Sequence, residues 1–204
     1  MFDYFTAALI GYCFGGFQTA YILGKKFKKI DIRNHGNGNL GASSATKIMG
    51  WKYGIIIALA DILKAVFAVL LVKLIFNDST VLLFVAGVFT ILGHVYPILL
   101  KFKGGKGTAS LIGIFLGINY KIAIILIITI VLITIITDYI AVGTIVIVTM
   151  LPILVYVFGY PMQAVYLCLF ITILSIFKHL PNVKKIIRKE EPGLRGTLKK
   201  RKRG

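Results

Sequence analysis

The residues best suited to chemistry lie in one short segment, the glycine loop (residues 101–107), which joins two long apolar stretches. It combines three cations with three glycines: Lys101, Lys103, Lys106, Gly104, Gly105 and Gly107. Glycine allows backbone N–H groups to converge on an oxyanion, and neighbouring lysines add positive charge. The glycine loop therefore suits a phosphate-bearing substrate. The alternative is a cytoplasmic loop that is basic only because of membrane topology.

A second polar segment, the asparagine-glycine loop (residues 31–41), precedes a stretch that can form a helix. Its glycines at 36, 38 and 41 make helix formation costly before about residue 42, so the loop should lead into a helix N-terminus. Helix N-termini favour anions. Neither loop matches a nucleotide-binding motif. No strand precedes the asparagine-glycine loop, as a dinucleotide-binding motif requires, and in the glycine loop Gly107 follows Lys106 where a Walker A motif has Ser or Thr. An ordinary flexible connection remains the alternative.

A third polar cluster, with Lys178, His179, Asn182 and Glu191, lies near the end of the chain. A single histidine at a membrane edge is more often a structural hydrogen-bonding group than a catalyst. Here all three clusters are predicted on the same side of a membrane. We therefore expect them to meet.

The composition is that of a membrane protein. The chain of 204 residues is 58% hydrophobic and 15% charged, with a mean hydropathy of +0.89. Its net charge of +17 comes from cations clustered in 25–52, 101–107 and 184–203, beside apolar segments. This is the positive-inside pattern and does not indicate nucleic-acid binding. Cys13 and Cys168 lie in apolar segments and form no disulfide framework or metal-ligand spacing.

Apolar runs divide the chain into membrane spans. Six are long enough to cross a bilayer as helices: residues 4–24, 53–76, 81–100, 121–137, 139–158 and 161–178. Residues 108–119 are apolar but shorter, so we expect a half-helix that begins beside the glycine loop. Seven crossings place every large basic segment inside, with the N-terminus outside and the C-terminus cytoplasmic. The sequence thus predicts an all-α integral membrane protein, with one membrane-embedded domain (1–183) and a basic cytoplasmic tail (184–204).

Some polar and small residues inside the spans have predicted structural roles. Asp61 and Lys64 are three residues apart on one helix face, which favours an internal ion pair. Gly11 and Gly15 form a small-xxx-small pair that is typical of close helix packing. Gln18 should face the protein interior.

Together these features resemble the PlsY family, membrane acyltransferases that move a fatty acyl group from acyl phosphate to glycerol 3-phosphate in bacterial phospholipid synthesis. The resemblance covers nearly the whole chain and rests on these segments: residues 21–25, 31–33, 38–42, 61–64, 93–97 and 102–107, Asn182, and Glu191-Pro192. It implies a seven-helix fold with its active site on the cytoplasmic face of the cell membrane.

The chain departs from the family pattern in two regions. The family usually has Ser at 37, Thr-Asn at 43–44 and Arg at 47, where this chain has Asn37, Ser43-Ser44 and Lys47. In the first span, Ser-Ile-Pro is replaced by Gly16-Phe17-Gln18. Asn can still hydrogen-bond a phosphate, but Lys in place of Arg loses the planar bidentate fork. A diverged paralogue with an altered acceptor is therefore an alternative.

The resemblance and the chemistry together assign roles to the site residues. Lys106 and the amides of Gly104, Gly105 and Gly107 would hold the acyl phosphate and the developing oxyanion. Substrate binding would also involve Asn37, Gly38, Asn39, Gly41 and Lys47, and catalysis His179 and Asn182. Asp61, Lys64, His94 and Glu191 would be structural or supporting.

Acyl phosphate carries its own leaving group, so no covalent nucleophile is required. The chain agrees, since it has neither a G-x-S-x-G nor an H-x4-D motif. The proton of the acceptor could pass to a substrate phosphate or to His179. No cofactor or metal is expected.

Two other functions fit some of the same features. A transporter of a phosphorylated or anionic solute could bind anions in the same loops without changing bonds, and a basic membrane anchor could recruit a partner through its tail. The expected partners of the enzyme are anionic membrane lipids, contacted by Lys199 to Arg203, and an enzyme that produces acyl phosphate. No nucleic acid is expected.

Overall fold

The computed structural model describes residues 1–196, which form helices joined by short loops and contain no strand. Within them, six helical segments are long and apolar enough to cross a membrane: Phe2–Lys28, Trp51–Ile75, Thr80–Leu100, Tyr120–Thr137, Ile140–Val157 and Met162–Ile187. A shorter apolar helix, Thr108–Ile118, follows the glycine loop as predicted. The all-helical membrane class is confirmed. Seven crossings and the orientation of the termini remain predictions.

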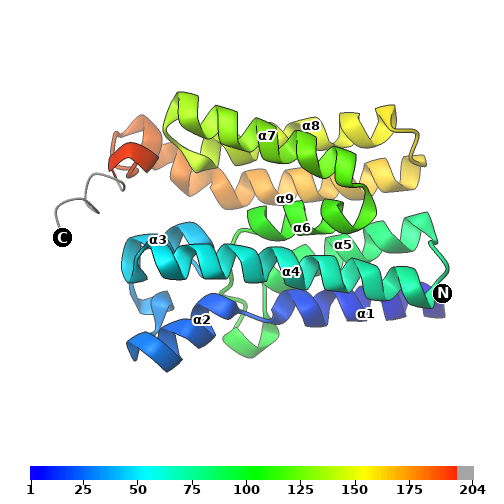
Figure 1. The fold of residues 1–204 in the computed structure, drawn as a ribbon, viewed down its shortest axis with the longest axis horizontal. Helices are drawn as coiled ribbons and strands as arrows, with labels where there is room; N and C mark the ends of the chain where they lie inside the picture. The colour runs from blue at the N-terminus through cyan, green and yellow to red at the C-terminus, as the bar shows by residue number, and fades with distance from the viewer. Residues whose placement is uncertain (197–204) are drawn as a thin grey trace. The chain divides into compact units, whose positions relative to one another are not determined.

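The helices fall into two compact units, one of Met1–Tyr120 and one that begins at Lys121. In the first unit, α1 (Phe2–Gly16) packs along α5 (Thr80–Val95), and both contact α4 (Trp51–Ile75) (Figure 1). A side chain at Gly11 would collide with the carbonyl oxygen of Ala86, and one at Gly15 with that of Thr90. The predicted close packing of this glycine pair is therefore confirmed.

The first predicted span, residues 4–24, is not one continuous helix. α1 ends at Gly16, Phe17 is extended, and the chain continues as α2 (Thr19–Leu23) and a π-helical turn, η1 (Gly24–Lys28). The Gly15-Gly16 pair weakens the helix at this point. The break also frees the carbonyl oxygen of Phe17 to accept a hydrogen bond from Lys64 Nζ at 2.7 Å. Gln18 is 4% exposed, which confirms that it faces the interior.

Short helical segments accompany the two predicted loops of the first unit. η2 (Ile32–Asn34) lies within the asparagine-glycine loop, which leads into α3 (Ala42–Met49), and the glycine loop lies between η3 (Ile98–Leu100) and α6 (Thr108–Ile118). α3 begins at Ala42, as its glycine-rich approach predicts. α3 and α6 both pack on α4, so one long helix supports both loops.

The second unit contains α7 (Tyr120–Thr137), α8 (Ile140–Val157) and α9 (Met162–Ile187). α8 and α9 pack together, and Thr172 Oγ1 donates to the carbonyl oxygen of Val148 at 2.6 Å. The predicted end of the last span at residue 178 is wrong, because α9 continues through residues assigned to the tail. Lysines favour helix even beyond the apolar run. The predicted lipid contact of Lys199 to Arg203 lies outside the described residues.

The segment after α9 returns to the turn between α7 and α8. The amide of Leu194 donates to the carbonyl oxygen of Asp138 at 2.8 Å, and the amide of Arg195 donates to Asp138 Oδ1 at 2.8 Å. Arg195 Nη2 also donates to the carbonyl oxygen of Ile135 at 3.0 Å. The turn and the start of the tail therefore lie at one end of this unit, as expected if both are on the same side of a membrane.

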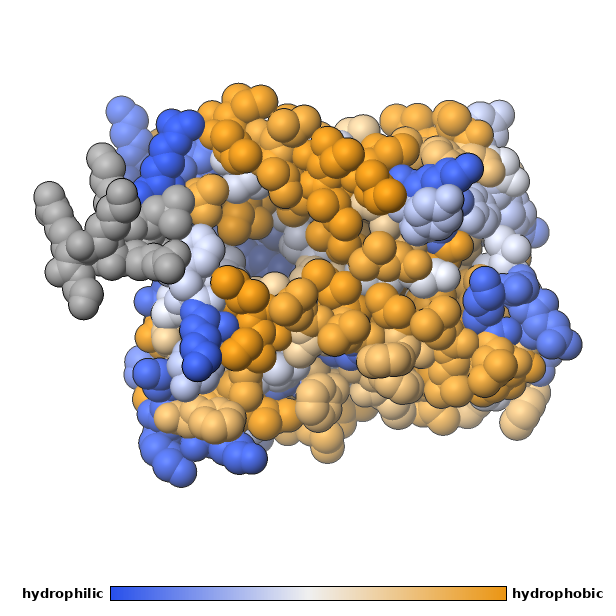
Figure 2. Space-filling model, in the orientation of Figure 1, coloured by the Kyte–Doolittle hydropathy of each residue, from blue (hydrophilic) through white to orange (hydrophobic). Residues whose placement is uncertain are grey.

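Each unit carries apolar side chains on its flank. In the view of Figure 2, hydrophobic residues cover the length of α4, and hydrophilic residues gather near α2 and α3. Phe67 on α4 and Ile136 on α7 are 54% and 72% exposed. Such side chains are stable in lipid and costly in water, so these flanks fit the hydrocarbon core of a bilayer.

Candidate functional site

The glycine loop folds back onto the end of α5. Lys101 and Phe102 both have left-handed backbone conformations, with φ of 54° and 60°, and they turn the chain. The amide of Phe102 donates to the carbonyl oxygen of Pro97 at 3.0 Å, and the amide of Gly105 to that of His94 at 3.0 Å. Gly107 ends the loop at φ 87°, a conformation that strongly favours glycine. The loop thus leads directly into α6.

Two of its glycines are required by packing within the protein. A side chain at Gly104 would collide with the carbonyl oxygen of His94, and one at Gly105 with the His94 imidazole. The amide of Gly105 is also bonded to His94, so its predicted role toward an oxyanion needs correction. The amides of Gly104 and Gly107 remain predicted ligands, as does Lys106, which is partly buried.

The two predicted loops of the first unit meet. The amide of Leu40 donates to the carbonyl oxygen of Gly104 at 3.2 Å, and Arg33 Nη1 donates to that of Leu100 at 3.3 Å. These bonds join the asparagine-glycine loop to Leu100, just before the glycine loop, and to Gly104 in its middle. The predicted encounter of these two polar clusters is therefore confirmed.

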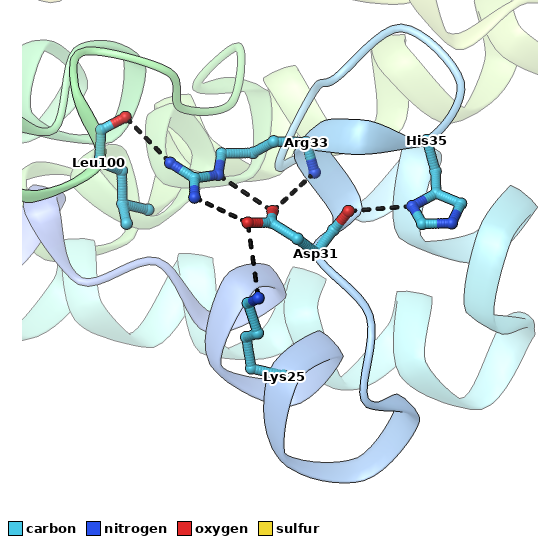
Figure 3. Close-up of polar contacts among 5 residues, drawn as sticks. All are labelled: Lys25, Asp31, Arg33, His35 and Leu100. Atoms are coloured by element: carbon cyan, nitrogen blue, oxygen red, sulfur yellow. Dashed lines mark hydrogen bonds and ion pairs between the residues drawn. The ribbon is translucent and has the colours of Figure 1, made fainter.

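Asp31 and Arg33 form a clasp beside this junction (Figure 3). Arg33 donates from Nε and Nη2 to the two carboxylate oxygens of Asp31, at 3.0 and 2.7 Å, and Lys25 lies 3.8 Å from the same carboxylate. The guanidinium also stacks 4.8 Å from the ring centre of Tyr21. The hydrogen bond from Arg33 lowers the pKa of Asp31 to about 2, so the carboxylate stays ionised near neutral pH.

No role for this clasp was predicted from the sequence, although residues 31–33 carry part of the family resemblance. Two charged residues separated by one position in a loop do not reveal that one of them has a partner on another loop. Arg33 has that partner in the carbonyl oxygen of Leu100, and backbone acceptors leave no signal in a single sequence. Asp31 and Arg33 thus hold the two loops together.

The approach to α3 contains most of the predicted acceptor residues. Asn37 and Lys47 are exposed, and Gly38, Asn39 and Gly41 are partly buried. Ser44, in the first turn of α3, donates from Oγ to Asn37 Oδ1 at 3.3 Å. Two of the positions at which the chain departs from the family pattern are therefore in contact with each other.

Three ionisable residues in the spans of the first unit, Asp61, Lys64 and His94, form a buried cluster. Lys64 Nζ lies 2.8 Å from Asp61 Oδ1, which confirms the predicted internal ion pair. The same ammonium lies 2.8 Å from His94 Nδ1, a contact that the sequence did not predict. Lys64 on α4 thereby contacts the histidine on which the glycine loop folds.

His179, Asn182 and Glu191 belong to the second unit. His179 is 3% exposed, and its Nδ1 lies 2.8 Å from the carbonyl oxygen of Ser175, which can only accept. A neutral His179 therefore carries its proton on Nδ1 and has an acceptor lone pair on Nε2. Asn182 lies three residues further along α9, on the same face. The encounter of this cluster with the two loops remains a prediction.

Comparisons of the sequence with known proteins agree with one another. A sequence model of the family described as "Glycerol-3-phosphate acyltransferase" matches residues 5–189. Glycerol-3-phosphate acyltransferase 1 of Oceanobacillus iheyensis is 40% identical, over 97% of this chain and 98% of the relative. The glycerol-3-phosphate acyltransferase of Bacillus subtilis is 38% identical, over 90% of this chain and 94% of the relative.

The fold is also similar to two crystal structures of PlsY, described as an integral membrane glycerol 3-phosphate acyltransferase. Its glycerol 3-phosphate form is 28% identical, with a TM-score of 0.88 over 96% of this chain and 97% of that one. Its lysophosphatidic acid form is 27% identical, with a TM-score of 0.84 over 96% of both chains. The likeness therefore covers the elements that carry all three polar clusters.

Proposed function

The chain belongs to the glycerol-3-phosphate acyltransferase family and is a membrane acyltransferase, and we propose that it acylates the 1-hydroxyl of glycerol 3-phosphate with acyl phosphate as donor. The products are lysophosphatidic acid and inorganic phosphate. The structure similar to this one was solved with the acceptor and with lysophosphatidic acid, which is the acceptor bearing one acyl group. That pair of forms carries the proposal.

The reaction does not require a covalent intermediate between the substrate and the protein. Acyl phosphate is a mixed anhydride, so phosphate is already a good leaving group. The acceptor oxygen attacks the acyl carbon, the bond from that carbon to the phosphate oxygen breaks, and the hydroxyl proton passes to a substrate phosphate or to His179 Nε2. Positioning of the hydroxyl and stabilisation of the oxyanion supply the rate enhancement.

The proposed donor site is the glycine loop. Lys106, together with the amides of Gly104 and Gly107, holds the phosphate of the donor and the developing oxyanion. Three features support this role: the partly buried lysine, the tight fold of the loop onto α5, and the α6 N-terminus that follows it. A helix N-terminus contributes partial positive charge to the same place.

The proposed acceptor site is the approach to α3. Asn37 and Lys47 contact glycerol 3-phosphate, and Gly38, Asn39 and Gly41 shape the turn that precedes the helix. His179 and Asn182, on α9, are proposed to act in catalysis. Glu191 orders the start of the tail. Both proposed sites lie on the cytoplasmic face of the bacterial cell membrane, where a partner enzyme supplies acyl phosphate and the basic tail contacts anionic lipids.

The contact between Asn37 and Ser44 yields a prediction about the acceptor site. Asn37→Ser shortens one side of the pair and Ser44→Asn lengthens the other, so each single variant disturbs the contact. We expect kcat/KM for glycerol 3-phosphate to fall about three- to tenfold, the equivalent of a disrupted hydrogen bond of about 1 kcal/mol. The double variant exchanges the hydroxyl and the amide and restores the contact. It should recover most of the activity, whereas additive losses would contradict the pairing.

The function itself is tested with the purified full chain in detergent. Acyl phosphate and glycerol 3-phosphate together should give equal amounts of inorganic phosphate and lysophosphatidic acid, and omission of the acceptor should abolish both. An acyl thioester in place of acyl phosphate tests the donor class. Phosphate release that does not depend on the acceptor would reject the proposal. Anion flux across liposomes without acyl transfer would support the transporter instead.

A further inference from the structure

We propose that Lys64 is a positioning residue that holds the glycine loop through His94. This inference rests on the proposed function, because it concerns the readiness of the loop to bind its substrate. Lys64 lies within the span formed by α4, and the loop lies beyond the end of α5. One side chain, His94, connects the two.

The ammonium of Lys64 has a complete set of acceptors. Its three N–H groups match three partners: Asp61 Oδ1 at 2.8 Å, the carbonyl oxygen of Phe17 at 2.7 Å and His94 Nδ1 at 2.8 Å. Because an ammonium can only donate, Nδ1 of the imidazole must accept. The proton of a neutral His94 is therefore on Nε2, and the orientation of the ring is determined by Lys64.

His94 in turn contacts the glycine loop twice. Its carbonyl oxygen accepts the amide of Gly105 at 3.0 Å, and its imidazole Nε2 occupies the space that a side chain at position 105 would take. The same carbonyl oxygen also accepts Gln18 Nε2 at 3.0 Å. The carbonyl oxygen and the imidazole of His94 thus hold Gly105 from two sides, an arrangement that we call the His94 bracket.

An ion pair alone would not require this arrangement. A buried charge needs an opposite charge and satisfied hydrogen bonds, and Asp61 with a backbone oxygen could supply most of that to Lys64. The third bond is directed instead at the residue that supports the loop. A glycine-rich loop has much conformational freedom to lose, so an external bracket raises the fraction of molecules in which the loop is ready to bind.

The test uses the full chain and a variant that removes both charges. An unpaired buried charge would by itself destabilise the fold, and Asp61→Asn combined with Lys64→Met leaves none. His94→Phe is the second variant, since it keeps a ring of similar size and removes the acceptor. Thr172→Val is the matched control, because it removes a buried hydrogen bond between α8 and α9.

Two readouts separate positioning from stability. Hydrogen exchange of the peptide that contains residues 101–107 should become at least about tenfold faster in both cluster variants and stay unchanged in Thr172→Val. The KM for acyl phosphate should rise about tenfold while kcat changes less than about threefold, since saturating substrate selects the ordered loop. The proposal would be overturned if the double variant and His94→Phe were folded and their glycine loops exchanged hydrogen at the same rate as that of the wild type. Hydrogen exchange is measured without substrate, so it tests the positioning role of Lys64 separately from the proposed acyltransferase function.

Discussion

Lys106→Ala will lower kcat for acyl transfer by about 10²- to 10³-fold, the usual consequence of removing one preorganised group that stabilises an oxyanion. The side chain is partly buried in a loop that is tightly folded onto α5, so its charge acts where water is partly excluded. The measurement is phosphate release under saturating acyl phosphate and glycerol 3-phosphate. The melting temperature of the variant should stay within a few degrees of that of the wild type.

Lys103→Ala is the matched control for this prediction. Lys103 belongs to the same loop and is exposed, so its removal changes the net charge equally and leaves the proposed site intact. It should lower the rate less than about threefold, because exposed charges are strongly screened. Equal losses in the two variants would mean that the loop acts through general positive charge, which is the topological interpretation of its lysines.

The helical layout of this chain was largely predictable because long apolar runs and clustered cations constrain it. The ion pair of Asp61 and Lys64 followed from a spacing of three residues, and the start of α3 from the glycines before it. The ends of the first and last spans were not predictable in the same way. α1 breaks where the Phe17 carbonyl oxygen finds Lys64 as a partner, which is a tertiary contact. α9 extends past its apolar run because lysines tolerate helix.

The candidate site shows a similar division. Residue type and order indicated which loops would bind anions, and the structure brings two of them together at Leu40 and Gly104. The sequence could not reveal how each glycine is used. Gly105 serves the packing of His94, a residue eleven positions earlier, and only the folded chain places the two in contact.

The contact between Asn37 and Ser44 changes the interpretation of these two differences from the family pattern. Taken singly, they suggested an altered acceptor. In the structure, a hydroxyl and an amide face each other at 3.3 Å, and the chain has exchanged which position carries which group. An exchange that keeps both groups favours a retained acceptor over a new one. Lys47 remains the departure that changes chemistry, since an ammonium lacks the bidentate fork of a guanidinium.

Gly105→Ala should lower both the stability and the activity of the protein. The added carbon meets the imidazole of His94, which is itself held by Lys64, so neither side can move freely. Overpacking of this kind costs about 1–3 kcal/mol of unfolding free energy. Displacement of the loop by about 1 Å would lower kcat/KM by about 10²-fold. Unfolding in mixed micelles and the phosphate-release assay measure the two effects.

Gly16→Ala provides the control, because a side chain at Gly16 meets nothing within 4 Å. A double-mutant cycle with His94→Ala then identifies the cause. If the imidazole is the obstacle, adding Gly105→Ala to His94→Ala should cost less than about 0.5 kcal/mol of stability, although activity stays low because the bracket is gone. If the glycine is needed only for close approach of phosphate, Gly105→Ala alone should leave stability unchanged. Stability and activity therefore respond differently, and together they show whether Gly105 is needed for close approach of the substrate phosphate or for packing against His94.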